Sequence, residues 1–360
     1  MAKTRVAILF GGRSAEHTVS LRSAKNVIRS IDKNKYDLVF IGIDMQGNWF
    51  HYDTQAKLTE IESTGNLTLD NPKGKLSLTL EAKGRFVNSA GEEVFVDVAF
   101  PVLHGPYGED GSVQGMFKLA SIPFVGPSLL GSAVGMDKDI MKRLLRDAGL
   151  PIGHYICLRK SQPVPSFKEI EEAVGMPCFV KPANLGSSVG ISKARNEEEL
   201  EKAIAMAFQF DKKIVIEEFI PGREIECAVL GNEDPKASVT GEVVVHHDFY
   251  SFDSKYIDDQ GSETQVPADI PKEAQEKIRE FAVRTFTALE CEGLGRVDVF
   301  YQEDGNMVVN EINTIPGFTS ISMYPMLWKA SGIEYGPLID KLIQLAFDRF
   351  EVEQQYKVEV

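Results

Sequence analysis

Acidic side chains recur between residues 295 and 313, which read GRVDVFYQEDGNMVVNEIN. Two runs of alternating apolar and polar residues flank the dipeptide Asp304-Gly305, a preferred two-residue turn of β-hairpins. A hairpin with this turn brings Asp298 opposite Glu311 on one face of the strand pair. Directly opposed carboxylates, with Cβ atoms about 5 Å apart, repel each other. We therefore expect a positive charge between these two side chains.

The same register places Arg296 opposite Asn313, beside the two acids. Carboxylate and amide oxygens are hard ligands that suit Mg²⁺, whose coordination is often completed by nucleotide phosphates and water. The hairpin therefore predicts that Asp298, Glu311 and Asn313 bind Mg²⁺ next to a nucleotide. In the alternative interpretation, the hairpin presents a solvated acidic face in which Arg296 is the internal partner of the acids.

A second candidate segment spans residues 179–193, which read FVKPANLGSSVGISK. A strand that ends near Lys181 leads into a loop of Gly and Ser, whose N–H groups and hydroxyls can bind phosphate oxygens beside the lysine charge. An ordinary flexible hairpin would have a similar composition. The GSSVG of this loop matches the nucleophile motif of serine hydrolases, but that motif requires a following helix. A strand-like segment follows instead, which disfavours a hydrolase. The sequence contains no P-loop motif, so an ATP site here would be of another type.

The third candidate segment, residues 215–226, joins an apolar strand to a Pro-Gly turn and a second strand. It carries Glu217 and Glu218 before the turn and Glu224 after it. These features indicate a hinge between two subdomains, where strand-edge backbone groups could bind an adenine edge and a carboxylate could bind ribose hydroxyls. The alternative is a set of exposed acids on an edge strand.

The elements that position these segments follow an α/β pattern. Apolar runs at residues 5–10, 38–43 and 96–100 predict buried strands, with an amphipathic helix between the first two. This order predicts a doubly wound parallel sheet, which residues 122–126 would complete as a last strand. Residues 49–93 are weakly periodic, and we expect hairpins there.

Helices and strands alternate again in the second part of the chain. Start and stop signals predict a helix over residues 137–149, and Ser166 and Asn196 are expected to cap two further helices, the second with a capping box completed by Glu199. Further strands and a long helix are expected at residues 154–158, 178–181, 214–219, 224–230 and 272–290. The polar, aperiodic stretch 246–267 has the length of a lid or binding loop.

Length and composition narrow the class of protein. A chain of 360 residues is expected to form two or three domains. Its 53 acidic and 39 basic residues give a formal net charge of −14, which disfavours a partner that is a nucleic acid. No apolar run approaches the roughly 20 residues of a membrane span, and no targeting segment is recognised. The four cysteines lack metal-ligand spacing, and we expect a protein of the reducing cytoplasm. No membrane partner is expected.

Seven motifs occur along the chain in the order found in D-alanine–D-alanine ligases, which belong to the ATP-grasp superfamily. The chain resembles this family over nearly its whole length. The motifs are Gly11-Gly-x-Ser-x-Glu-His17, His104-Gly-x-x-Gly-Glu-Asp-Gly111, Met136-Asp-Lys138, Val180-Lys-Pro182, Gly186-Ser-Ser-Val-Gly190, Gly295-Arg-x-Asp298 and Asn310-Glu-x-Asn-x-x-Pro-Gly317.

The resemblance implies three α/β subdomains: an N-terminal doubly wound parallel-sheet domain (1–126), followed by the central (127–217) and C-terminal (218–360) lobes of an ATP-grasp fold. The C-terminal lobe would contain the lid at 246–267 and the metal hairpin at 295–313. The implied reaction is ATP-dependent ligation of two D-alanines through a D-alanyl phosphate, for peptidoglycan precursor synthesis. A homodimer is the expected assembly. The alternatives are another ATP-grasp carboxylate–amine ligase and, in a different class, a non-catalytic nucleotide-binding regulator.

The resemblance also assigns the nucleotide contacts, with ATP between the two lobes. The residues expected on its phosphates are Lys138, Lys181, Ser187, Ser188 and, from the lid, Lys255. The residues expected on its adenine and ribose are Glu217, Glu218, Phe219, Ile220 and Glu224. The residues that match metal ligands, for two Mg²⁺ ions or Mn²⁺ in their place, are Asp298, Glu311 and Asn313.

The two D-alanines are assigned in the same way. The ammonium of the first is expected at Glu16, with His104 nearby. The carboxylate of the second is expected at Ser322, with Met323 beside it.

The remaining assignments concern the reaction itself. Arg296 and the N–H of Gly317 resemble an oxyanion site. Glu16, Ser187 and Tyr256 resemble a hydrogen-bonded set that closes the lid, and Tyr256 acting through Ser187 is one candidate for the base that deprotonates the attacking amine. In this family a tyrosine at the position of Tyr256 accompanies dipeptide synthesis, whereas phenylalanine accompanies ligases that also use D-lactate.

Overall fold

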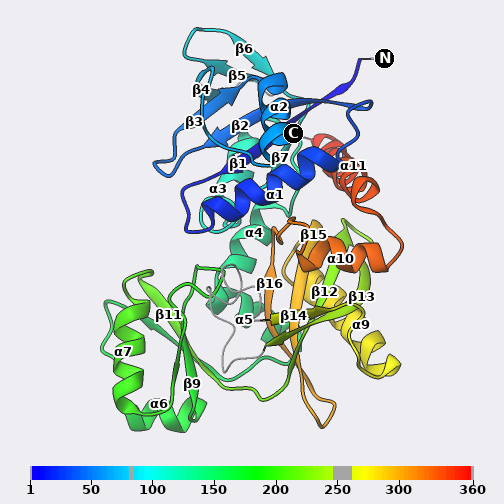
Figure 1. Cartoon of the computed structure of the whole chain (residues 1–360). Helices are drawn as coiled ribbons and strands as arrows, with labels where there is room; N and C mark the ends of the chain where they lie inside the picture. Colours follow the sequence, from blue (N-terminus) through cyan, green and yellow to red (C-terminus); the bar gives the residue numbers. More distant parts are fainter. Residues whose placement is uncertain (1, 81–84, 246–261, 358–360) are drawn as a thin grey trace.

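The computed structural model describes residues 2–80, 85–245 and 262–357, and their strands form three sheets (Figure 1). The first is a seven-stranded sheet in the order β6-β5-β4-β3-β2-β1-β7. Its strands are β1 (Thr4–Gly11), β2 (Tyr36–Ile43), β3 (Trp49–Tyr52), β4 (Gly74–Thr79), β5 (Arg85–Asn88), β6 (Glu93–Phe95) and β7 (Val98–Pro101). β1 pairs in parallel with β2 and β7, which confirms the predicted parallel sheet. The helix α1 (His17–Ser30) connects β1 to β2 and buries Ala24, Val27 and Ile28.

Residues 49–93 extend this sheet with antiparallel strands. The expected hairpins are present as the pairs β4–β5 and β5–β6. The helix α2 (Thr54–Thr64) was not expected, because its burial of only Lys57 and Ile61 gives it little apolar periodicity. Its start was nevertheless encoded, since the Asp53 side chain accepts a hydrogen bond of 2.9 Å from the N–H of Ala56.

The prediction of a full strand at residues 122–126 was wrong. The chain there makes a single parallel bridge between Phe124 and Ala99, at the free edge of β7. Two backbone hydrogen bonds of 2.8 Å hold it, from Ala99 N–H to the Pro123 carbonyl and from Val125 N–H to the Ala99 carbonyl. The helices α3 (Ser112–Leu119) and α4 (Leu129–Met136) lie on either side of this segment in the chain.

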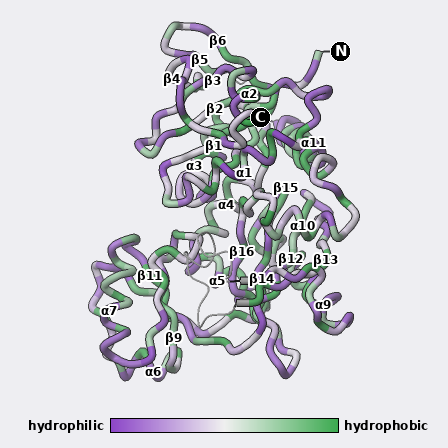
Figure 2. The backbone as a smooth tube through the Cα atoms, viewed as in Figure 1, coloured by the Kyte–Doolittle hydropathy of each residue, from purple (hydrophilic) through white to green (hydrophobic). Residues whose placement is uncertain are grey.

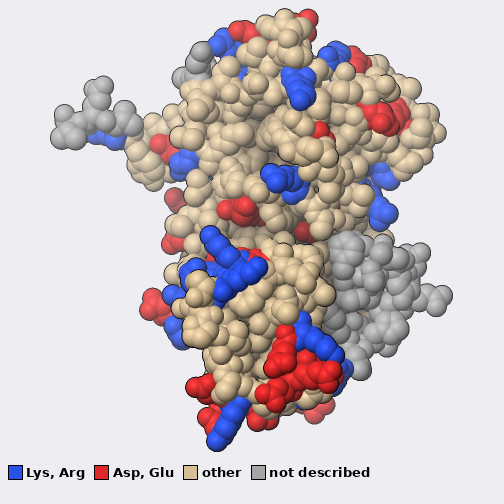
Figure 3. Space-filling view, turned by 90° about the vertical axis from the view of Figure 1, so that its left-hand side faces the viewer, with Lys and Arg blue, Asp and Glu red and all other residues tan. Residues whose placement is uncertain are grey.

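The second sheet has four strands in the order β10-β9-β11-β8 and forms, with α6 and α7, what we call the central lobe. Its elements are β8 (Tyr155–Arg159), α6 (Phe167–Val174), β9 (Cys178–Pro182), β10 (Ser192–Ala194), α7 (Glu197–Ala207) and β11 (Lys213–Glu218). Ser166 caps α6 as expected, and Glu169 completes a capping box there that was not predicted. Asn196 caps α7 as expected, but Glu199 accepts from the N–H of Arg195 rather than of Asn196, so the capping box predicted for this helix was wrong. From outside, this lobe carries acidic and basic side chains next to one another (Figure 3).

The third sheet, in the order β14-β13-β12-β15-β16, forms the C-terminal lobe with α9. Its strands are β12 (Arg223–Gly231), β13 (Lys236–Val245), β14 (Ser262–Gln265), β15 (Gly293–Tyr301) and β16 (Met307–Asn313). β14 lies inside the stretch expected to be an aperiodic lid, which corrects that expectation for residues 262–265. Residues 246–261, with Lys255 and Tyr256, lie outside the described residues. The remaining helices are α5 (Lys138–Asp147), α9 (Lys272–Ala288), α10 (Met323–Ala330) and α11 (Tyr335–Gln354).

The N-terminal domain and the C-terminal lobe share a hydrophobic core. One cluster of buried side chains contains Phe10 and Phe40 of the first sheet together with Tyr324 of α10 and Leu342 of α11. α11 returns from the C-terminal lobe to pack beside α1 and β7, as Figure 1 shows. In Figure 2, hydrophobic and hydrophilic residues alternate along both the strands and the helices. The central lobe has a separate apolar cluster around Val180 and Ile216.

Candidate active site between the two lobes

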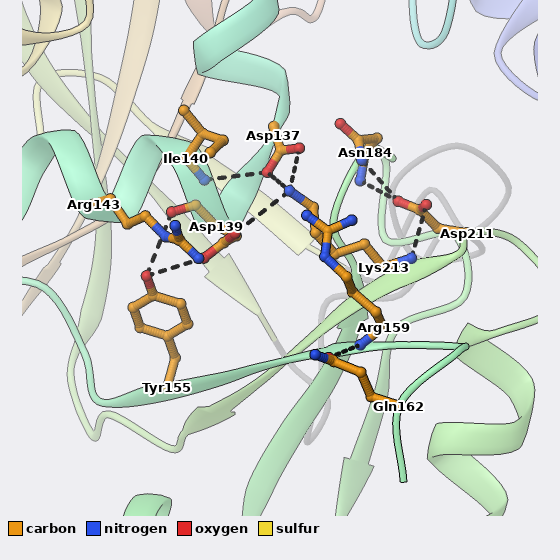
Figure 4. A network of polar contacts seen from close by, with 10 residues as sticks. All are labelled: Asp137, Asp139, Ile140, Arg143, Tyr155, Arg159, Gln162, Asn184, Asp211 and Lys213. Carbon is orange, nitrogen blue, oxygen red and sulfur yellow. Dashed lines mark hydrogen bonds and ion pairs between the residues drawn. The ribbon is translucent and has the colours of Figure 1, made fainter. Parts of the chain in front are cut away.

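A buried cluster of charges places the start of α5 against the central lobe (Figure 4). Asp137 caps α5 by accepting from the N–H of Ile140 at 3.1 Å. Lys213, at the first position of β11, donates to the same carboxylate at 2.6 Å and lies 3.5 Å from Asp139. These contacts hold Lys138, which lies between the two acids in the sequence, at the boundary of the lobes.

The Lys138 side chain is 6 % exposed and points toward the loop after β9. Its backbone N–H donates to the Ala183 carbonyl at 3.0 Å, and its Nζ donates to the Leu185 carbonyl at 2.7 Å. The same Nζ lies 3.6 Å from Glu311 of β16. Lys138 therefore connects the Gly- and Ser-containing loop after β9 to the hairpin formed by β15 and β16.

Glu217 at the end of β11 binds two lysines. Its carboxylate lies 2.8 Å from Lys181 and 3.5 Å from Lys142. Burial alone would raise the pKa of Glu217, but the charges of the two lysines outweigh it and lower the pKa to about 2. Burial lowers the pKa of Lys142, whereas for Lys181 the attraction of Glu217 overcomes burial and raises the pKa. The site thus holds concentrated positive charge, as a triphosphate requires.

The hairpin β15–β16 has the predicted register at the candidate metal site, but not the predicted turn. Asp298 is opposite Glu311, and Arg296 is opposite Asn313. Near the turn, however, Gln302 bonds with Asn306, and the connection is three residues long. A β-bulge between Asp298 and Val299 inserts Asn310 and restores the expected pairing. The prediction of a two-residue turn was therefore wrong. The predicted pairing of Asp298 with Glu311 was correct because the bulge compensates for the extra residue in the turn.

The bulge directs Asn310 toward two residues of the candidate nucleotide site. Its side-chain oxygen lies 3.5 Å from Lys181 Nζ, and its Nδ2 donates to Glu224 at 3.3 Å. Glu224 stands on β12, so this side chain connects the central lobe to the C-terminal sheet.

The positive charge beside Asp298 is that of Arg296, the internal partner in the alternative interpretation of the hairpin, and the Mg²⁺ predicted between Asp298 and Glu311 stays a prediction. Its Nε and Nη2 donate to the two oxygens of Asp298 at 2.8 and 2.7 Å, and its Nε lies 2.8 Å from Glu226. Asn313 donates to Asp298 at 2.9 Å. Within the described part of the chain no three His, Cys, Asp or Glu side chains are grouped to hold a metal ion. A metal ion here would therefore use the amide oxygen of Asn313 together with the two acids.

A cavity of about 380 Å³ opens between the central and C-terminal lobes. At one end Phe179 and Phe219 pack with ring centroids 6.2 Å apart, and Lys193 lies 4.2 Å from the centre of the Phe219 ring. This apolar end suits a planar base. The predicted nucleotide residues that line the cavity are Lys138, Lys181, Ser187, Ser188, Glu217, Glu218, Phe219, Ile220 and Glu224, and Glu311 lines it too.

The loop after β9 connects this cavity to the N-terminal domain. Ser187 lines the cavity, and its hydroxyl donates to the Glu16 carboxylate. Ser187 and Ser188 have φ values of 51° and 59°, a left-handed conformation that costs energy for residues other than glycine. Burial and the charge of Glu16 raise the pKa of Glu109, which accepts from the N–H of Gly105 at 2.7 Å.

The residues predicted for the second half of the reaction lie in the turn after β16. A Cβ built on Gly317 would come within 2.8 Å of the Ser322 hydroxyl, so these two residues are adjacent. Ser322 accepts from the N–H of Thr319 at 2.9 Å and does not cap α10 with its side chain. Met323 is 5 % exposed and packs against Gly241 of β13.

The sequence analysis missed three buried or cavity-lining side chains. Lys142 follows Lys138 by four residues, so the helical period places both on one face of α5. Glu226 follows Glu224 by two residues, so both face the same side of β12. Asn310 had no signal, because the bulge that redirects it depends on the pairing of the whole hairpin.

Comparison with known proteins finds one family that matches both the N-terminal domain and the two lobes. Models of the D-Ala-D-Ala ligase N-terminus and C-terminus match residues 5–127 and 144–344. The chain is 50 % identical over 361 residues to D-alanine–D-alanine ligase A of Salmonella typhimurium, which covers 99 % of both chains. The chain belongs to the D-alanine–D-alanine ligase family.

Solved structures of this family superpose on the whole chain. A D-Ala:D-Ser ligase from Enterococcus faecalis has a TM-score of 0.85 and 39 % identity, covering 96 % of this chain and 100 % of its own. A D-alanine–D-alanine ligase from Bacillus anthracis, complexed with ATP, has a TM-score of 0.73 and 28 % identity, covering 97 % and 99 %. The α/β fold with an N-terminal parallel sheet and two ATP-grasp lobes is therefore the family fold.

Proposed function

We propose that the protein uses ATP to join two D-alanine molecules into D-alanyl-D-alanine, for peptidoglycan precursor synthesis. The observation that carries this proposal is the contact between Ser187 and Glu16. Ser187 lines the cavity for the nucleotide, and Glu16 is an acid that can bind an ammonium group. A D-alanine whose ammonium lies at Glu16 therefore has its carboxylate beside the phosphates.

ATP would lie in the cavity between the lobes. Lys138 and Lys181 face its phosphates, with the N–H groups and hydroxyls of Ser187 and Ser188 beside them. The adenine would lie against the phenylalanines at the apolar end, near the backbone of residues 218–220, and Glu224 would bind the ribose hydroxyls. Lys142 also lines the cavity and lies 3.5 Å from Glu217, so it adds positive charge near the phosphates.

Asp298, Glu311 and Asn313 would hold Mg²⁺ or Mn²⁺, and two ions are proposed. The donor set fits such ions, since it consists of carboxylate and amide oxygens on one face of a hairpin. When bound, the ions neutralise charge on the phosphates. Arg296 would then remain available to Glu226 and to the substrate.

The reaction needs two transfers. A carboxylate oxygen of the first D-alanine attacks the γ-phosphorus of ATP, and ADP leaves. The neutral amine of the second D-alanine then attacks the acyl carbon. The bond between this carbon and the phosphate oxygen breaks, phosphate leaves with the electron pair of that bond, and the proton of the attacking nitrogen passes to a base. Arg296 and the N–H of Gly317 would stabilise the oxyanion of this second step, while Ser322, beside Met323, binds the second carboxylate. Lys255 and Tyr256 stay predicted contributors to phosphate binding and closure.

A coupled assay of ADP release tests the proposal. Activity is expected with D-alanine as both substrates, and not with L-alanine or without an amino acid. D-serine and D-lactate, offered as acceptors with D-alanine, test the choice of second substrate, which mass spectrometry of the product resolves. ADP release that does not depend on any D-amino acid would contradict the proposal.

The proposal also covers the oligomeric state and the cellular location of the protein. We propose a homodimer in the cytoplasm, where ATP is available. Among the described residues, no helix has the length and apolar character to cross a bilayer. Sedimentation velocity at micromolar concentration measures the assembly directly, and a monomer under those conditions would contradict it.

A further inference from the structure

His104 lies at the junction of three segments and is 4 % exposed. Its Nδ1 is 3.1 Å from the carbonyl of Ile315, and its Nε2 is 2.9 Å from the hydroxyl of Ser23. A carbonyl can only accept a hydrogen bond, so Nδ1 carries the proton. The neutral ring then accepts the Ser23 hydroxyl at Nε2, and burial supports this state because it lowers the pKa of His104 to about 4.

Ser23 extends the contact to the other end of the same turn. Its side chain is fully buried in α1, and its oxygen accepts from the N–H of Phe318 at 3.2 Å. The turn from residue 315 to 318 is thus held at both ends, by His104 at Ile315 and by Ser23 at Phe318. Gly317, the proposed oxyanion donor, lies between these two attachments.

The backbone of His104 holds a different segment. Its carbonyl accepts from the Ser14 hydroxyl at 2.7 Å, and the Ser14 oxygen accepts from the N–H of Glu16 at 3.1 Å. Ser14 is 8 % exposed and Glu16 is 7 % exposed, so water does not compete for these bonds. One residue therefore connects the segment that carries Glu16 to the turn that carries Gly317.

We propose that Ser14, Ser23 and His104, here called the His104 cluster, position the first-substrate acid and the oxyanion turn relative to each other. This inference rests on the proposed function for the roles of Glu16 and Gly317. The cluster spans the two halves of the reaction, because Glu16 holds the acyl donor and Gly317 stabilises the oxyanion formed from it. Misplacement of about 1 Å can cost roughly 10²-fold in rate, so hydrogen bonds of this kind affect turnover without touching substrate.

The chain offers a matched control for Ser23. Ser20 lies three residues earlier on α1, is also fully buried, and bonds to the backbone of Gly11 at 2.8 Å and of Val102. Ser20→Ala and Ser23→Ala each remove one buried hydroxyl from the same helix. We expect Ser20→Ala to keep kcat within about twofold and Ser23→Ala to lower kcat about tenfold or more with unchanged KM for ATP. We expect Ser14→Ala to raise KM for the first D-alanine instead.

Amide hydrogen exchange separates this inference from the proposed function. In Ser23→Ala, the amides of Gly317 and Phe318 should exchange faster, while those of β1 and β9 keep their wild-type rates. Equal kcat values for the Ser20 and Ser23 variants, or exchange that rises equally in β1, would overturn the proposal. If Ser23→Ala does not fold, Ser23→Cys, which keeps a weak donor, provides the same two readouts. A failure of D-alanine ligation in the wild type would contradict the function, whereas the exchange result would still test the cluster.

Discussion

Arg296 illustrates how one side chain can satisfy two buried acids. Its guanidinium binds Asp298 with two hydrogen bonds and also lies 2.8 Å from Glu226. Asp298 and Glu226 are 2 % and 4 % exposed, and they face each other on adjacent strands. Burial alone would lower the pKa of Arg296, but these carboxylates raise it well above its usual value, so the guanidinium stays charged. A planar group with several donors is needed to serve both acids and a substrate oxygen.

Replacing Arg296 with lysine tests this geometry. A lysine keeps the charge but has no planar pair of donors, so we expect Arg296→Lys to lower kcat about 10²–10³-fold. The measurement is steady-state ADP release at saturating ATP and D-alanine.

Arg5→Lys is the matched control, because Arg5 also binds an acid, Asp97, through Nε and Nη2, at 3.1 and 2.7 Å, but lies in the N-terminal sheet. It should keep the wild-type kcat. A full rate for Arg296→Lys would show that a bidentate donor is not required at this position.

At the scale of elements, three pieces of backbone meet at Lys213. It joins β11 to the start of α5 through Asp137 and Asp139, and the neighbouring Asn184 after β9 binds Asp211 at 2.9 Å. Because the Lys213 side chain is 7 % exposed, its removal would leave Asp137 without this cation, and Asp139 would keep its contact with Arg143 at 2.9 Å.

We expect Lys213→Met to lower the free energy of unfolding by about 3–5 kcal/mol, the usual cost of breaking a buried ion pair. Urea unfolding measures this loss. Adding Asp137→Asn, which keeps the helix cap, should recover part of it because it removes one unpaired charge. An additive loss in the double variant would contradict the role of charge.

The β-bulge in β16 leads to a prediction about nucleotide binding. Asn310→Ala removes the contacts to Lys181 and Glu224 but leaves the strand pairing intact. Hydrogen bonds to charged groups contribute about 1.5–3 kcal/mol, and those of Asn310 are long, so we expect KM for ATP to rise about threefold to tenfold. kcat at saturating ATP should change less. Unchanged KM would mean that the contacts of Asn310 with Lys181 and Glu224 do not affect nucleotide binding.

The same hairpin shows how far sequence reasoning reaches. The alternation of side chains was sufficient to predict that Asp298 pairs with Glu311, whereas the Mg²⁺ expected between these acids stays a prediction. The turn was wrong because a three-residue connection and a bulge give the same pairing as a two-residue turn. The local sequence pattern does not distinguish a two-residue turn from a three-residue connection with a bulge. In the bulge, Asn310 contacts Lys181 and Glu224, which are far away in the sequence. In the same way, the short bridge at Phe124 follows from the packing at the edge of β7 rather than from its apolar run.

At the scale of the whole molecule, the N-terminal domain and the C-terminal lobe are joined by both apolar and polar contacts. The apolar part is the cluster that includes Phe10, Tyr324 and Leu342. The polar part contains His104, which binds the turn after β16 from the N-terminal side. A change in the charge of this one side chain should therefore affect the stability of the folded chain.

The pH dependence of stability follows from the sign of the His104 shift. Burial lowers the pKa of His104 from its usual value of 6.5 to about 4, so between these values the unfolded chain binds a proton that the folded chain does not. The contribution of His104 to the free energy of unfolding is therefore fully present above about pH 6.5. It falls as the pH decreases toward 4, by about 3 kcal/mol in total. His104→Gln has no titrating ring, and all other groups are the same in both proteins. The stability advantage of the wild type over His104→Gln, measured by urea unfolding, should therefore shrink between pH 7 and pH 4. Parallel pH curves for the two proteins would mean that the pKa of His104 is the same in the folded and the unfolded chain.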